Sequence, residues 1–302
     1  MTENKRKISN VGGSNVGQIV LNIIFIIICL CYLLPLMLMV SISISSEQAI
    51  TDFGYTLIPK EVNFEGYKAI FRNPKQILDA YKVTTIFTLA GTALTVVCNA
   101  MAAYPLSRNN FKYKKKVTWF LYLPHFIGGG MVPTYILNTR YLHLDNTIWI
   151  YIIPGMVAVG TIFVMRTNFK QLPDGLIEAA KMDGASESRI FFQFVIPLST
   201  PVLATMAFNS LVGRWQNWNT SLMYIRRSDL YSLQYLLMRI INNADFINKM
   251  ALEGVQDMTD VVPPTETMRY AMAVVAAGPV MCIFPFFQKY MAKGLTIGTV
   301  KG

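Results

Sequence analysis

Residues 178–201 read EAAKMDGASESRIFFQFVIPLSTP and form a polar island between two long apolar segments. Asp174, which lies shortly before this stretch, is predicted to cap the start of a helix. The Asp183-Gly184 pair is a turn signal, and it predicts that this helix stops at Gly184. A second short helix is predicted over residues 187–195. We therefore expect a helix–turn–helix elbow that protrudes between the two apolar segments.

The surface of this elbow is predicted to meet another protein. The side chains of Ala179 and Ala180 are small enough for close packing, and Glu178 offers a charge for a basic partner. Pro197 is predicted to open the next apolar helix, where its missing N–H would be unpaired in any case. The predicted contact surface is thus joined directly to an apolar helix.

The composition indicates that a bilayer, not a soluble core, surrounds most of the chain. Of the 302 residues, 53% are apolar and only 15% are charged, whereas soluble proteins carry about 25% charged residues. A net charge of +10 could suggest nucleic acid, but most Lys and Arg lie in loops between apolar runs. A membrane span needs about 20 apolar residues. Six segments meet that length, namely residues 16–44, 83–104, 117–137, 147–165, 196–225 and 268–287.

The sequence therefore predicts an all-α integral membrane protein with six transmembrane helices. The short loop 108–116 carries five basic residues, which places it in the cytoplasm. Both termini and the elbow are then cytoplasmic as well. We expect one transmembrane domain over 1–302, with a core at 83–290, an N-terminal helix at 16–44, outer loops at 46–82 and 226–269, and a cytoplasmic loop at 166–196.

The third segment is not expected to be a straight helix, because it contains Pro124, Pro133 and three successive glycines at 128–130. Such a break survives at membrane depth only where protein or a water-filled cavity surrounds it. The second segment is rich in small residues, so it is predicted to lie inside the bundle. Four cysteines lie in apolar runs without His or Cys at metal-binding spacing, and we interpret them as small hydrophobic residues.

The elbow resembles the EAA loop of permease subunits in bacterial ATP-binding-cassette importers. That signature is Glu-Ala-Ala, three residues, Gly, nine residues, then Ile-x-Leu-Pro, and residues 178–197 keep its spacing. Phe194 and Ile196 depart from the family residues, but both are apolar. The stretches GGGMVPTY (128–135), MRTNF (165–169), WQNWN (215–219) and QKYMAKGLTIG (288–298) resemble the carbohydrate group, MalG-like, and the first is more typical of oligosaccharide importers with a lipoprotein receptor.

The resemblance implies how the chain would work. Six helices would pack against a related permease subunit, and the elbow would sit in a groove of a separate ATPase whose closure tilts the membrane halves. The ATPase-coupling residues would be Glu178, Ala179, Ala180, Asp183, Gly184 and Pro197. The chain lacks a Gly-x-x-x-x-Gly-Lys-Ser/Thr loop, so it is not expected to be an enzyme or to bind a cofactor itself.

The expected partners follow from the same resemblance. They are a second homologous permease subunit, two ATP-binding-cassette ATPases that carry ATP and Mg²⁺, an extracellular solute-binding lipoprotein, an oligosaccharide and membrane lipid, but no nucleic acid. The expected location is the bacterial plasma membrane, as a multi-pass protein.

Arg214 is the charge that falls within the fifth segment, and it predicts a cavity or a partner. At helical spacing one face would hold Ser210, Arg214, Asn217, Trp218 and Ser221. Such a polar arc with an indole suits a sugar, and Arg214→Ala would then abolish import without loss of assembly. Alternatively, Arg214 pairs with a carboxylate or carbonyl of the second permease subunit. His125 could bond a sugar hydroxyl or a backbone carbonyl freed by the helix break.

Three other functions remain open on the sequence. The chain could import another class of solute. A membrane enzyme would need a nucleophile–base or metal constellation, which His125 and His143 do not supply. An ion-coupled transporter would need carboxylates or histidines at mid-membrane, and no carboxylate can be placed there. Co-purification with an ATPase would support the importer subunit, and ion-driven flux through the chain alone would support the ion-coupled transporter.

Overall fold

The structure, a computed structural model, describes residues 15–72, 74–252 and 265–297, with side chains placed over 17–72, 74–242 and 265–291. These residues form helices without a named strand, apart from one isolated antiparallel bridge between Ser45 and Val62. The predicted all-α class is confirmed over this part of the chain. The chain divides into two compact units, the first Met1–Ala69 with Thr265–Val274 and the second Ile70–Pro264 with Val275–Gly302.

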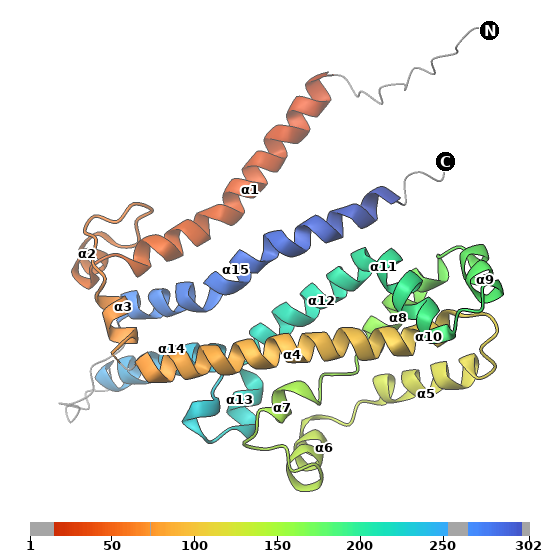
Figure 1. The fold of residues 1–302 in the computed structure, drawn as a ribbon. Helices are drawn as coiled ribbons and strands as arrows, with labels where there is room; N and C mark the ends of the chain where they lie inside the picture. Colours follow the sequence, from red (N-terminus) through yellow and green to blue (C-terminus); the bar gives the residue numbers. More distant parts are fainter. Residues whose placement is uncertain (1–14, 73, 253–264, 298–302) are drawn as a thin grey trace. The chain divides into compact units, whose positions relative to one another are not determined.

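In the first unit, α1 (Asn15–Ser43) is a long apolar helix with Pro35 inside it (Figure 1). Its side chains from Gly17 to Met37 are exposed, including Phe25 at 62% and Leu33 at 51%. A helix satisfies its backbone hydrogen bonds within itself, so such a surface is suited to lipid. The predicted first segment, 16–44, matches α1 closely.

The end of α1 is built into a small folded region. Its members are α2 (Glu47–Phe53), α3 (Glu65–Ile70) and the first turns of α15 (Glu266–Ile297). The two carboxylate oxygens of Glu47 accept hydrogen bonds from the backbone N–H groups of Glu266 and Thr267, at 3.1 and 3.2 Å. Gly66 lies so close to the carbonyl of Thr267 that a Cβ would come within 2.8 Å of its oxygen. Glu47 therefore caps the N-terminus of α15.

The second unit is organised around α4 (Pro74–Ser107), which packs along α8 (Val159–Lys170) and α12 (Thr200–Trp215) (Figure 1). Phe87, Ala100 and Ala103 of α4 are fully buried, so the prediction that this segment lies inside the bundle is confirmed. The helix starts at Pro74 rather than Val83, because the polar residues before Val83 continue the same helix. Its polar buried residues are Thr84, Thr88, Thr92, Thr95, Asn99 and Ser107.

The third segment is broken, as predicted. The positive φ angles of Gly128 and Gly130, 44° and 79°, separate its two α-helical parts. Only glycine adopts such angles without strain. The parts are α5 (Lys114–Ile127) and α6 (Met131–Ile136), the latter continuing into the π-helix η1 (Leu137–Tyr141).

The fourth and fifth segments, which were predicted from the sequence only as apolar stretches of sufficient length, are also divided into shorter helices. Non-helical residues 153–158 separate α7 (Trp149–Ile152) from α8. The fifth segment bends by 80° between α11 (Ile196–Leu198) and α12, where Pro197 and Pro201 remove backbone donors. It breaks again at residues 216–218, before α13 (Asn219–Tyr224).

The predicted outer loop 226–269 contains a long helix that the sequence did not indicate. The loop begins with η3 (Ser228–Leu230) and continues into α14 (Leu233–Leu252), while residues 253–264 lie outside the described part of the chain. The residues of α15 from Val275 on belong to the second unit, where Trp215 Nε1 donates to the Ala276 carbonyl at 2.9 Å. By length and composition, three described helices could cross a membrane, namely α1, α4 and α15, or four with the bent pair around Ser199. Six spans, cytoplasmic termini and a single domain stay predictions.

Candidate functional site

The elbow begins with α9 (Asp174–Met182), and its end is fixed by Gly184. Gly184 has a φ of +77°. Its N–H donates to the Lys181 carbonyl at 3.0 Å, and the Ala185 N–H donates to the Ala180 carbonyl at 3.0 Å. These two bonds form a Schellman motif, which needs a left-handed residue at Gly184. The prediction that the helix stops there is confirmed.

The start of α9 differs from the prediction in one respect. Pro173 is the N-cap residue, and Asp174 is the first helical residue, without a capping hydrogen bond from its side chain. Proline here pre-sets the backbone and leaves the carboxylate of Asp174 in the first turn, where a negative charge is favoured by the helix dipole. Asp174 therefore supports the helix start by charge and not by capping.

The second half of the elbow is α10 (Glu187–Ile190), followed by the π-helix η2 (Phe191–Val195). Ser186 caps α10, with its hydroxyl accepting the Arg189 N–H at 3.3 Å. The predicted helix over 187–195 is present, but its second part is wound as a π-helix. This winding is accompanied by burial of Ile190, Phe191 and Val195.

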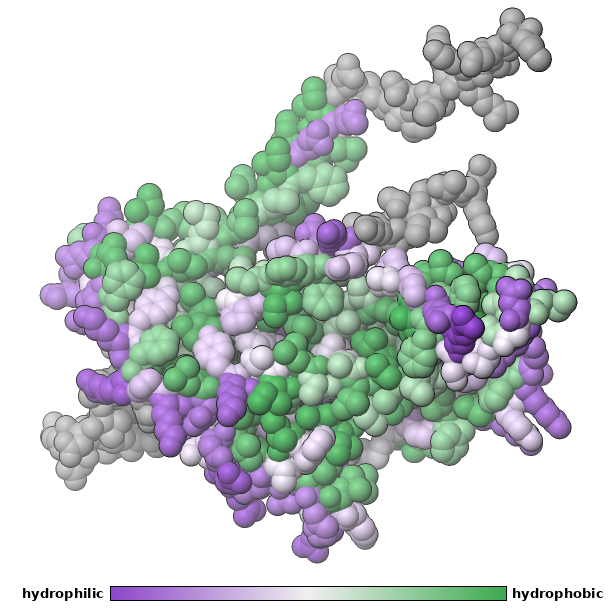
Figure 2. Space-filling model, in the orientation of Figure 1, coloured by the Kyte–Doolittle hydropathy of each residue, from purple (hydrophilic) through white to green (hydrophobic). Residues whose placement is uncertain are grey.

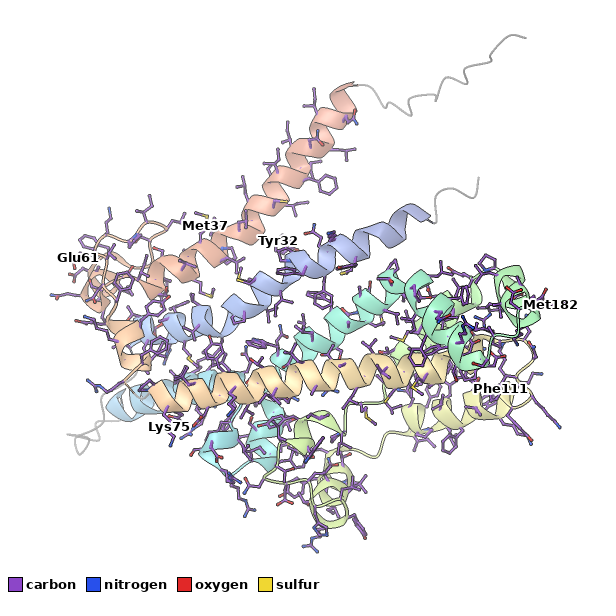
Figure 3. All side chains as sticks on the ribbon, viewed as in Figure 1. Tyr32, Met37, Glu61, Lys75, Phe111 and Met182 are labelled. Atoms are coloured by element: carbon purple, nitrogen blue, oxygen red, sulfur yellow. The ribbon has the colours of Figure 1, made fainter. Side chains whose placement is uncertain are left out.

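One side of α9 is buried and the other side is exposed. Ile177 and Ala180 are buried, 5% and 6% exposed, in a core cluster with residues of α4, α8 and η2. Glu178 and Ala179 are exposed, and Met182 is 88% exposed and projects from α9 (Figure 3). The prediction that Ala180 faces a partner is therefore wrong, because its small side chain lets α9 pack on its own chain. Hydrophilic residues gather on the part of the surface around α9 (Figure 2). Asp183, Gly184 and Pro197 are also exposed.

Polar contacts join the elbow to the end of α4. Glu187 Oε2 accepts the hydroxyl of Tyr104 at 2.6 Å, and Glu187 Oε1 lies 2.5 Å from Lys181 Nζ. The Arg108 guanidinium lies 5.0 Å from the Tyr104 ring centroid and 3.9 Å from the Asp174 carboxylate. The hydrogen bonds from Lys181 and then from Tyr104 hold the pKa of the Glu187 carboxyl below its ordinary value.

Arg214 occupies a second polar site, in the middle of the unit. It is 8% exposed and donates to the carbonyls of Tyr151 (2.6 Å) and Gly155 (3.0 Å) and to Thr95 Oγ1 (2.9 Å). We call these residues the Arg214 socket. Two of the acceptors lie at or beside the break between α7 and α8, so the guanidinium bonds carbonyls that the break has freed.

The break is also served by residues of α4. Asn99 Oδ1 accepts the Ala158 N–H at 2.9 Å, and its Nδ2 donates to the Met156 carbonyl at 3.1 Å. A Cβ on Gly91 would come within 2.5 Å of the Arg214 guanidinium, so a glycine gives the socket its room. Arg214 and Asn99 thus satisfy backbone hydrogen-bonding groups at the break in the fourth segment. Thr95 bonds the guanidinium, and Gly91 leaves room for it.

The predicted polar face of the fifth segment does not exist as one helical face, because α12 ends at Trp215. Ser221 is buried on α13 and bonds the Tyr151 hydroxyl at 2.6 Å. Asn217, two residues before α13, accepts the Thr220 N–H with its Oδ1 at 3.0 Å. Trp218 is 36% exposed, Ser210 is partly buried, and His125 is exposed with its ring near that of Phe126. The structure connects Arg214 and Ser221 through Tyr151. It connects Asn217 to Ser221 through the Ser232 hydroxyl, which donates to the Asn217 carbonyl at 3.0 Å and accepts from Ser221 at 2.8 Å.

A hollow of about 270 Å³ lies between α6, α7 and α13. Sequence reasoning missed its polar residues, since they belong to three short helices whose packing no local pattern reveals. Its lining is Met131, Thr134, Asn138, Ile150, Pro154, Asn219, Thr220, Met223 and Tyr224. Within the described residues, no three His, Cys, Asp or Glu side chains lie close enough to hold a metal ion.

Comparison with known proteins identifies the family and several relatives. The family model described as "Binding-protein-dependent transport system inner membrane component" matches residues 10–297. Protein LplC of Bacillus subtilis is 33% identical over 258 residues, which cover 85% of each chain. The B. subtilis polygalacturonan/rhamnogalacturonan transport system permease protein YtcP is 31% identical, over 82% of this chain and 85% of that protein.

The fold is also similar to a solved structure. A chain from the crystal structure of a bacterial ABC transporter involved in the import of the acidic polysaccharide alginate superposes with a TM-score of 0.77 and 26% identity. The match covers 92% of this chain and 99% of that one. The agreement in fold therefore extends over nearly the whole chain.

Proposed function

Because the chain belongs to the family of binding-protein-dependent transport system inner membrane components, we propose that it is one membrane-spanning subunit of an ATP-driven importer. It passes an oligosaccharide from an extracellular binding protein to the cytoplasm, together with a second permease subunit. ATP and Mg²⁺ are bound by two separate ATPase subunits, and this chain receives their movement through the elbow. It lies in the bacterial plasma membrane with six spans and both termini inside.

The observation that carries this proposal is the two-sided geometry of α9. Its inner face, Ile177 and Ala180, is fixed in the core of the second unit, and its outer face, Glu178 and Ala179, is exposed. The Schellman motif at Gly184 fixes where the helix ends. A short helix held rigidly on one side and open on the other is suited to fit a groove in another protein and to transmit its displacement.

The substrate is proposed to be an oligosaccharide released from a polysaccharide. YtcP is named for polygalacturonan and rhamnogalacturonan, and the solved relative imports alginate. Another relative, GanQ of B. subtilis, is named for galactooligosaccharides. Two of these three names describe acidic polymers, so acidic oligosaccharides are the first to test, with neutral ones beside them.

Within the path, we propose different roles for the residues that the sequence placed together. Trp218 and His125 are accessible enough to touch a passing sugar, and Asn217 and Ser210 are partly so. Arg214 and Ser221 are buried and bonded to their own chain. We assign them to positioning the path, without sugar contact.

The proposal is tested by purifying the chain with its neighbours after placing alanine at Gly184. A non-glycine residue at a positive φ costs about 1–2 kcal/mol, so Gly184→Ala should shift the end of α9. The expected result is ATP hydrolysis that continues without matching oligosaccharide uptake, or loss of the ATPase from the complex. Gly175→Ala is the matched control, because Gly175 lies on the same helix with open space around it. A wild-type chain that imports sugar without any ATPase would contradict the proposal.

A further inference from the structure

The carboxylate of Glu187 makes two different bonds with its two oxygens. One oxygen pairs with Lys181 in the last turn of α9, at 2.5 Å, and the other accepts the hydroxyl of Tyr104 on α4, at 2.6 Å. We propose that Glu187 is a positioning residue that links α9 to α4, so that a displacement of α9 is passed to the long central helix. This inference rests on the proposed function, because it concerns how the elbow acts once an ATPase moves it.

The Lys181–Glu187 pair spans the turn between α9 and α10, where the angle between the two helices could otherwise change. Residues 183–186 join α9 to α10 through Gly184, and the Lys181–Glu187 pair closes this turn from one side to the other. Apolar packing alone is non-directional and permits sliding, whereas two charge-assisted hydrogen bonds define a position. Glu187 therefore fixes the angle between α9 and α10 while it holds both to Tyr104.

Tyr104 is itself held in place from two sides. Its ring packs on Phe191 of η2 with centroids 5.3 Å apart, and the Arg108 guanidinium lies over it at 5.0 Å. The nearest carboxylate to Arg108, that of Asp174, lies at 3.9 Å, which is too long for a hydrogen bond. Among the described residues, the direct hydrogen-bonded connection from the exposed end of α9 to α4 thus runs through Glu187.

The test uses the complete importer, with this chain, its partner permease, the ATPases and the binding protein reconstituted in proteoliposomes. Tyr104→Phe removes only the hydroxyl, and Glu187→Gln removes the charge while keeping the shape. Each variant should lower the sugar imported per ATP hydrolysed by about threefold to tenfold, the range expected when a charge-assisted bond at a partly exposed site is lost. ATPase co-purification and ATP hydrolysis should stay at the wild-type level.

Two matched control variants and one charge-reversed double variant separate the positioning role of Glu187 from an effect on general stability. Tyr113→Phe changes an exposed tyrosine, and Ser188→Ala changes an exposed residue next to Glu187; both should keep the wild-type ratio. The reversed pair, Lys181→Glu with Glu187→Lys, should recover part of the ratio that Glu187→Lys alone loses.

The inference is overturned by a wild-type import-to-hydrolysis ratio in Tyr104→Phe and Glu187→Gln. It is equally overturned if these variants lose the ATPase from the complex, because Glu187 would then serve docking. The proposed function fails by a different result, namely that the wild-type chain associates with no ATPase.

Discussion

The second unit uses charge in two contrasting places, the Arg214 socket and the Glu187 link. Arg214 is 8% exposed and its guanidinium is bonded to backbone carbonyls and a hydroxyl. The side chains of Lys181 and Glu187 are 40% and 59% exposed and form an ion pair. The first charge is enclosed among groups that cannot ionise, and the second is paired with an opposite charge beside water.

The surroundings of each charge determine what its removal would do. An enclosed guanidinium surrounded by carbonyls has no alternative partner, so removing it orphans acceptors that water cannot reach. An exposed ion pair contributes little stability, and its members can exchange partners with solvent. We therefore expect the socket to be required for folding and the link to be required for transmitted movement. Variants of Arg214, Gly91 and Glu187 test that division.

Arg214→Ala is expected to have the largest effect. Each buried carbonyl left without a donor costs about 1–3 kcal/mol, so the variant should fail to accumulate or should melt well below the wild type in detergent. The sequence alone predicted that this variant would assemble but fail to import, and the burial of Arg214 replaces that expectation. Thermal unfolding followed by tryptophan fluorescence measures it, with the exposed Arg140→Ala as the control. A fully assembled Arg214→Ala complex with a wild-type melting temperature would remove the distinction between the two regions.

Gly91→Ala is expected to have the second largest effect, because its Cβ would stand 2.5 Å from the guanidinium. An overpacked buried site typically costs about 1–3 kcal/mol. In the Arg214→Ala background the same methyl group meets empty space, so the two changes should be strongly non-additive. Gly160→Ala is the control, since nothing lies within 4 Å of its added Cβ. Additive melting shifts in the double variant would show that Gly91 serves some other contact.

The smallest effect concerns acid. The pKa of the Glu187 carboxyl is lowered by Lys181 and Tyr104, so its bonds contribute fully at neutral pH and are lost as the pH falls through the lowered value. An ordinary glutamate titrates near 4.3, so the protection of α9 and α10 amides from hydrogen exchange should decline only at a pH below that ordinary value. The exchange rates are corrected for their intrinsic pH dependence and compared with those of Glu187→Gln. Equal acid sensitivity of the two proteins would exclude Glu187 as the cause.

The elbow was largely predictable because its signals are local. The Asp183-Gly184 turn, the proline at 197 and the spacing of the apolar residues all act within about twenty residues. The side of α9 that faces inward was not predictable in the same way. Ala180 is as small as Ala179, and only the packing of α4 and α8 decides which of the two is buried.

The Arg214 socket illustrates the opposite situation. The sequence marked Arg214 as unusual but could not supply its partners, because Thr95 and Tyr151 are 119 and 63 positions away along the chain. The break in the fourth segment did carry a local signal. Pro154-Gly155 is a turn dipeptide. It predicts a helix break whose carbonyls lack intrahelical donors and could accept hydrogen bonds from a buried arginine. Together with Arg214, this pair of residues would have indicated an internal role in place of a ligand.

The capping of α15 by Glu47 has a consequence for biosynthesis. The acceptor is made early, and its two donors, at residues 266 and 267, leave the ribosome more than two hundred residues later. The first unit combines the region after α1 with the first turns of α15, so it cannot be completed before α15 has been made. Until α15 arrives, the carboxylate of Glu47 must be satisfied by water, and the region around it stays incomplete while the intervening segments are inserted.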